Sequence, residues 1–148
     1  MFKRVHLVIG FFASLFFIPN VNNKLVFLPI VLIASIIPDI DAVIAPKKDY
    51  KILRKLKTKS YKDFMHSYTL CIVLSLLIAF FYPILALPFF VGYSFHLFFD
   101  SLTVGGTRPF WPLKVRSRGF IVPGGKAEKA ITLILGFLSV LLILRYIF

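Results

Sequence analysis

The segment GYSFHLFFDSL, residues 92–102, places two residues that are able to do chemistry inside an apolar run. His96 and Asp100 lie four residues apart, a spacing that puts both side chains on one face of a helix. Such a pair offers a metal ion one nitrogen and one oxygen ligand, although it also forms a simple hydrogen bond. Because ionisable residues at membrane depth are costly and usually functional, the apolar surroundings favour a site.

The sequence PDID, residues 38–41, is the second candidate. Two carboxylates as close as Asp39 and Asp41 repel each other unless a cation or a proton lies between them. Acidic groups at the end of a helix also oppose the helix dipole. A bound metal ion would offset both costs, and so would the many nearby lysines and arginines.

Three further residues have ordinary interpretations when each is taken alone. His6 follows a basic start and is typical of a membrane interface, and His66 precedes Ser67, a candidate helix cap. Glu128 begins the last apolar segment, where the helix dipole favours a negative charge. Their positions relative to His96 and the PDID turn decide whether they matter.

The composition indicates a membrane protein with one domain over residues 1–148. The chain is 59% hydrophobic, above the 45–50% of soluble domains, and its mean hydropathy is +0.88. Its single cysteine, Cys71, lies in an apolar run, cannot form an internal disulfide, and gives no sign of an oxidising compartment. The first residues resemble a signal peptide but lack a cleavage site, so we expect a retained helix.

Apolar segments separated by proline, asparagine, glycine and basic residues predict an all-α, polytopic bundle of about five helices. They are residues 5–18, 25–37, 67–82, 84–102 and 130–148. The first two are short: at ~1.5 Å per residue a run such as 5–18 covers about 21 Å of a ~30 Å hydrocarbon core. They either cross with the help of flanking residues or form a re-entrant hairpin.

An up-and-down order of these segments brings all the candidate residues to one end of the bundle. The same end receives Lys3 and Arg4 and the basic loops 47–62 and 108–129, which hold most of a net charge of +12. Basic loops beside apolar segments follow the positive-inside rule, so this end is predicted to face the cytoplasm, and nucleic-acid binding is not expected.

The charges and ligand types predict the metal. Four carboxylates, on Asp39, Asp41, Asp100 and Glu128, would need two or more divalent cations for neutrality. Mixed imidazole and carboxylate ligands suit zinc, manganese or iron better than calcium or magnesium. Two close metal ions are suited to activating water for displacement at phosphorus.

The longer pattern GYSFHLFFDSLTVGGTRPFWPL, with the early His6, the PDID turn, HS at residues 66–67 and GGKAE before the last helix, resembles the YdjM family of inner-membrane metal-dependent hydrolases. That family is grouped with all-helical zinc enzymes of the phospholipase C and P1 nuclease type. The resemblance implies hydrolysis of a phosphoester, such as a phospholipid. The ligands it implies are His6, Asp39, Asp41, His66, His96, Asp100 and Glu128.

The chain departs from the family pattern before His66. The family has R-G-x-T-H-S where this sequence has KDFMHS, so Lys62 keeps the charge of the arginine without its bidentate fork. Asp63 replaces the glycine and Met65 the small hydroxyl residue. After PDID the family often has another histidine, where this chain has Ala42.

Two functions follow as predictions. The first is a membrane-bound hydrolase that uses metal-activated water, with Asp39, Asp41 or Glu128 as the general base. The second is a non-catalytic membrane protein whose His/Asp cluster binds metal structurally or forms an ion or proton pathway. Membrane lipid is the expected partner, and loop 47–62 either holds an anionic head group or serves only as a topology signal.

Overall fold

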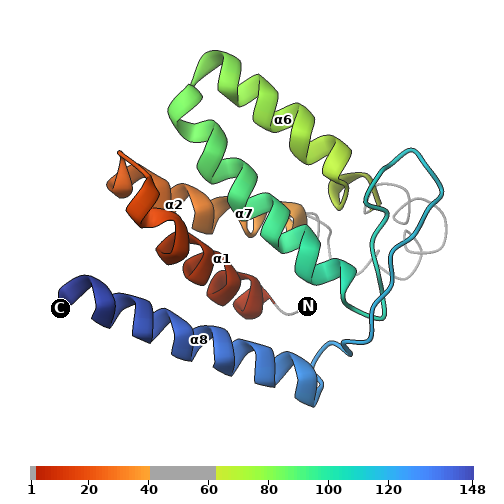
Figure 1. Ribbon diagram of the computed structural model, residues 1–148. Coiled ribbons are helices and arrows are strands. Elements are labelled where there is room, and N and C mark those ends of the chain that lie inside the picture. Colours follow the sequence, from red (N-terminus) through yellow and green to blue (C-terminus); the bar gives the residue numbers. More distant parts are fainter. Residues whose placement is uncertain (1–2, 41–62) are drawn as a thin grey trace.

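The protein is a helical bundle, seen in a computed structural model that describes residues 3–40 and 63–148 (Figure 1). Within these ranges there are two isolated β-bridges and no extended strand, so the all-α prediction is confirmed. The helices are α1 (Lys3–Phe17), η1 (Ile18–Asn20), α2 (Lys24–Ala34), η2 (Ile37–Asp39), α6 (Tyr68–Phe81), α7 (Pro83–Ser101) and α8 (Lys126–Ile147).

Local sequence signals account for the helix ends. Ser67 is the N-cap of α6, and its side-chain oxygen accepts a hydrogen bond from Leu70 N at 3.3 Å, which satisfies an amide with no partner inside the helix. Tyr82 ends α6, and Pro83 begins α7, a position where its missing N–H costs nothing. The predicted segment boundaries therefore agree with the helices to within a few residues.

Helix α7 lies at the centre of the bundle. It packs against α1, α2 and α6, whereas α8 packs chiefly against α1 (Figure 1). The starts of α1, α6 and α8 and the ends of α2 and α7 lie at the same end of the bundle. This is the arrangement that the up-and-down prediction required, and it gathers the polar helix ends in one place.

Two glycines allow close helix crossings beside that end. A Cβ at Gly92 in α7 would lie 2.3 Å from the carbonyl oxygen of Val31, and one at Gly10 in α1 would lie 2.7 Å from Ser35 Oγ. Both are shorter than real side chains tolerate, so α2 reaches α1 and α7 only because Cβ atoms are absent. The crossings bring Ser35 between the two neighbouring helices.

The segment between α7 and α8 folds back over the start of α6. Thr103 pairs with Ile121 and Thr107 with Ser117 in isolated bridges. Tyr68 N donates to Pro109 O at 2.7 Å, which fastens this segment to the first residue of α6. The segment therefore covers the same end of the bundle that holds the polar helix ends.

Asp63 provides a second attachment for that segment. Its Oδ2 lies 3.2 Å from Arg108 Nε, and its Oδ1 lies 3.1 Å from Arg116 Nη2. The carboxylate is buried and the two guanidinium groups are partly exposed. Asp63 thus forms an ion-pair cluster three residues before His66.

Two of the described helices, α7 and α8, are long and apolar enough to cross a membrane, and α1 and α6 are shorter apolar helices. Along α8 most large side chains are exposed, including Leu133 at 74% and Phe137 at 64%. Near the other end of the bundle, Tyr146 Oη donates to Leu15 O at 2.9 Å and ties α8 to α1. The basic loop 47–62 lies outside the described residues.

Candidate metal centre

The polar helix ends form one compact cluster of potential ligands. Asp39 from η2, His66 just before α6, and His96 and Asp100 from α7 each offer one ligand atom, and these atoms all lie within 4.8 Å of one another. His6 from α1 reaches the same carboxylate of Asp100. The three imidazoles are at most 2% exposed, so the cluster lies inside the bundle.

Asp100 is at the centre of this cluster. Its Oδ1 lies 3.3 Å from His6 Nε2, and its Oδ2 lies 3.5 Å from His66 Nε2 and 3.6 Å from His96 Nε2. His66 Nε2 also lies 3.4 Å from Asp39 Oδ1. One carboxylate is therefore shared by three imidazoles that come from different parts of the chain.

These separations fit metal ligands better than hydrogen bonds. An N–H···O bond is ordinarily about 2.7–3.2 Å long, and all four contacts exceed that range at 3.3–3.6 Å. Two ligands at ~2.0–2.1 Å from one tetrahedral zinc ion lie about 3.3–3.4 Å apart. The spacing of the donors therefore suits a divalent ion between them.

The tautomer of His96 leads to the same conclusion. Its Nδ1 lies 2.7 Å from the backbone carbonyl oxygen of Ser35, which only accepts, so Nδ1 carries the proton. In the neutral ring, Nε2 then presents a lone pair toward Asp100, and Nε2 has no hydrogen-bond partner among the described residues. A lone pair that faces a carboxylate requires a proton or a cation between them.

His6 lies face to face with His96. Their ring centroids are 3.7 Å apart and the ring planes differ by 17°. Neither nitrogen of His6 has a hydrogen-bond partner within the described ranges, although Nε2 is directed at Asp100. Stacked imidazoles of this kind repel each other if both are protonated. A metal ion bound between the imidazoles and the carboxylates therefore neutralises the carboxylates at a lower cost than two protons would.

Asp39 is the most exposed acid of the cluster, with 15% of its side chain accessible against 10% for Asp100. Burial would raise the pKa of its carboxyl group, but the adjacent His66 and the nearby imidazoles of His96 and His6 outweigh burial, so the pKa lies below its ordinary value. Asp39 therefore stays ionised at neutral pH and keeps its lone pairs for a cation.

Residues that the sequence prediction did not include hold the ligands in place. The Tyr93 hydroxyl donates to Met65 O at 2.6 Å, which fixes the residue next to His66. The Ser35 carbonyl orients His96. The signals were present in the sequence: Gly10 lies one turn after His6 and Gly92 one turn before His96, the spacing of a close crossing beside each ligand.

The structure does not bring every predicted residue into the cluster. Glu128 is in the first turn of α8, as expected. Its Oε2 accepts a hydrogen bond at 2.6 Å from the N–H of Gly124, one residue before the N-cap Gly125, and it is not among the four ligands that meet within 4.8 Å. Asp41 and Lys62 lie outside the described residues.

Comparison with known proteins assigns the chain to a family. None of the curated proteins or solved structures compared with it matches. A family model does match, over residues 1–148, and this agrees with the resemblance found through the His, PDID and GYSFHLFFDSL motifs. The chain belongs to the YdjM inner membrane protein family.

Proposed function

We propose that this protein is a multi-pass, membrane-bound hydrolase that depends on a divalent metal ion and acts on a phosphoester, with a phospholipid as the preferred class of substrate. The observation that carries the proposal is the buried cluster around Asp100, in which three imidazoles and two carboxylates meet at N···O separations of 3.3–3.6 Å. Buried ionisable groups at such a depth are expensive unless they have a function.

The donor set supports zinc as the metal. Imidazole nitrogens with carboxylate oxygens suit zinc, manganese and iron. The described cluster contains two carboxylates, Asp39 and Asp100, whose charges balance one divalent cation. A second ion, as the charge count of the sequence predicts, would need a further acid such as Asp41.

Different residues of the chain would bind the metal ion and accept a proton at such a site. His66, His96 and Asp100 would hold the ion from the buried side. His6 would contribute a third imidazole, which lies against the other oxygen of the Asp100 carboxylate. When bound, the ion supplies Lewis acidity and lowers the pKa of water. Asp39, the most accessible acid of the cluster, is the group placed to accept a proton from water that enters the site.

Positive charge near the cluster would favour a phosphate group. Arg108 and Arg116 both form ion pairs with Asp63, which precedes His66 by three residues. Both guanidinium groups keep part of their surface exposed. Together with Arg4, Lys126 and Lys129 they lie in segments at the same end of the bundle, whereas Arg145 lies in the last turn of α8. This bias supports the proposal that the metal-binding end faces the cytoplasm.

Metal analysis of the protein purified in mild detergent tests this proposal. Wild type is expected to carry about one equivalent of zinc per chain and to hydrolyse a phosphate diester or a short-chain phospholipid. His96→Ala should lose both, while Glu128→Gln, outside the cluster, should keep both. A wild-type protein that binds no added zinc, manganese or iron would refute the metal site.

A structural role for the same metal is the second candidate, because the near-complete burial of the three histidines resembles a closed site. Cobalt substitution separates the two. An open site changes its visible spectrum when phosphate is added, since phosphate takes a coordination position. A spectrum that phosphate leaves unchanged, with no hydrolysis of any phosphoester tested, would assign the metal to structure.

A further inference from the structure

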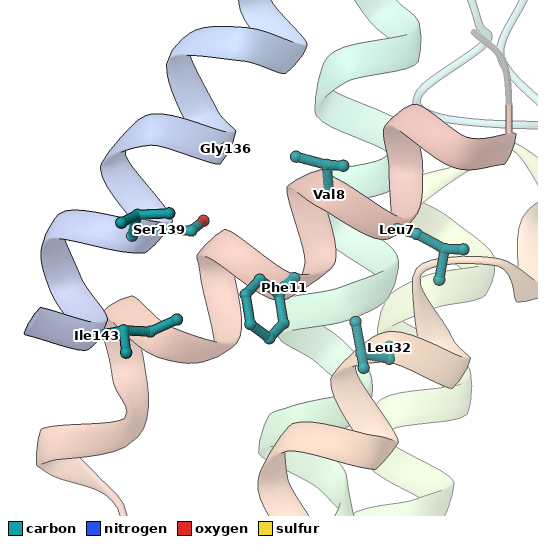
Figure 2. Close-up of a pocket in the computed structure, with 8 residues that line it drawn as sticks. Leu7, Val8, Phe11, Leu32, Gly136, Ser139 and Ile143 are labelled. Atoms are coloured by element: carbon teal, nitrogen blue, oxygen red, sulfur yellow. The ribbon is translucent and has the colours of Figure 1, made fainter.

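Two cavities lie between α1 and α8, and the second is also lined by Leu32 of α2. The one nearer the metal-binding end has a volume of about 840 Å³. The other has a volume of about 370 Å³, and the residues that line it are drawn in Figure 2. The first is lined by Arg4, Val5, Gly124, Glu128, Lys129, Thr132 and Leu133. The second is lined by Leu7, Val8, Phe11, Leu32, Gly136, Ser139, Val140 and Ile143. The two together are called the α1–α8 groove below.

The groove changes from charged to apolar along its length. Its mouth carries two exposed cations, Arg4 and Lys129, and the carboxylate of Glu128, which accepts from Gly124 N. The deeper part is lined by aliphatic and aromatic side chains. The exception is Ser139, whose hydroxyl donates to Leu135 O at 2.8 Å within α8. Its hydrogen is therefore already bonded, and the hydroxyl needs no polar group of a ligand as an acceptor. This order of surfaces matches an amphiphile with an anionic head.

The groove is distinct from the metal centre. At about 100° per residue, His6 points roughly half a turn away around α1 from Arg4 and Val8. His6 faces Asp100 and His96 of α7, while Val8 and Phe11 of α1 point into the space beside α8 and Leu7 points away from α8 (Figure 2). Helix α1 therefore separates two sites with different chemistry.

The length and the open side of the groove suit a lipid chain. From Lys129 to Ile143, α8 rises about 21 Å at ~1.5 Å per residue, which is deeper than one leaflet of a ~30 Å hydrocarbon core. Gly136 faces this space, and a Cβ added there would meet nothing within 4 Å. The seam thus leaves room that neither helix fills.

We propose that the α1–α8 groove binds one anionic phospholipid, with its head group between Arg4 and Lys129 and one acyl chain along Phe11 and Gly136. A second copy of the chain is a poorer occupant, since each copy has 18 lysines and arginines against six acids and would bring further positive charge to a cationic mouth. The lipid supplies both the opposite charge and the apolar chain.

Native mass spectrometry in mild detergent tests the groove, with phosphatidylglycerol and phosphatidylcholine of identical acyl chains as probes. Wild type should retain one phosphatidylglycerol and bind it about tenfold more tightly than phosphatidylcholine. Gly136→Leu fills the space beside α1 and should weaken binding of both lipids about tenfold or more. Ala130→Leu adds the same side chain at an exposed position of α8 outside the groove and should leave binding unchanged.

The charged mouth has its own pair of variants. Arg4→Gln with Lys129→Gln should remove the preference for phosphatidylglycerol, whereas Arg145→Gln, at the other end of α8, should keep it. Equal binding of the two lipids by wild type would overturn the proposal, and so would unchanged binding by Gly136→Leu. A stable dimer that Gly136→Leu dissociates would also overturn it and assign the groove to a second copy.

The outcome is independent of the proposed hydrolase. Gly136→Leu should keep the zinc content and the thermal unfolding temperature of wild type, because the groove lies across α1 from His6. A folded, zinc-loaded variant that has lost its lipid establishes the groove alone. Failure of the hydrolase assay leaves this comparison intact.

Discussion

Helices α7 and α8 are both long enough to cross a membrane, yet they occupy opposite environments. The more polar of the two, α7, has a mean hydropathy of 1.3 over an 18-residue stretch and lies at the centre of the bundle against three other helices. The more apolar, α8, reaches 2.3 over a stretch of the same length, packs chiefly on α1 and exposes most of its large side chains. In a bilayer, apolar residues gain little by leaving lipid, so polar and small residues define the interior.

The largest effect is expected from Asp100→Asn in α7. This change removes the charge that three imidazoles share, so zinc affinity should fall by more than about 100-fold, beyond the loss typical of an outer-shell partner. Competition with a metal chelator measures the affinity. Glu128→Gln in α8 is the matched control, and a similar loss in that variant would contradict the exclusion of Glu128 from the described cluster.

A smaller effect on stability is expected from Gly92→Ala. The new Cβ would meet Val31 O, which should cost about 1–3 kcal/mol of unfolding free energy. The same change at Gly136 in α8 meets nothing within 4 Å and should stabilise the helix by about 0.5–1 kcal/mol. Thermal unfolding in mild detergent measures both, and equal shifts would remove the contrast between the two helices.

Tyr93→Phe should have a moderate effect on both stability and metal binding. It leaves the carbonyl of Met65 without its hydroxyl donor, at a cost of about 1–3 kcal/mol. Zinc affinity should fall about tenfold, because His66 follows directly. Tyr82→Phe, at an exposed residue, serves as the control. Unchanged zinc affinity in Tyr93→Phe would show that His66 is positioned by other contacts.

The smallest effect is expected from Leu141→Ala on the exposed side of α8. Leu141 is 45% exposed and lines neither cavity of the α1–α8 groove, so the unfolding free energy should change by less than about 0.5 kcal/mol. Chemical unfolding in detergent measures it. A loss of 2 kcal/mol or more, of the size seen for buried leucines, would indicate that α8 packs against a partner in the membrane.

Much of the fold could be predicted because its signals are local. The helices could be placed from the prolines, from Ser67 and from the lengths of the apolar runs. Because successive helices run in opposite directions, His6, His66 and His96 come to one end of the bundle. The pairing of His6 with Asp100 was not predictable in detail, because the apolar pattern does not say which helices are neighbours. Glu128 illustrates the limit: a first-turn acid is suited both to a metal ion and to the start of a helix, and its Oε2 accepts a hydrogen bond from Gly124 N.

The hydrogen bond between His96 and Ser35 uses a backbone carbonyl, and this affects which positions a mutational scan of the protein would mark as sensitive. Any residue at position 35 provides that carbonyl, so a substitution scan would report tolerance there to whatever side chain fits beside Gly10. The sensitivity would appear instead at Gly10 and Gly92, which carry no functional group. Such a scan would thus find sensitive positions near the metal centre at two glycines. It would not detect the carbonyl oxygen of residue 35, which orients His96.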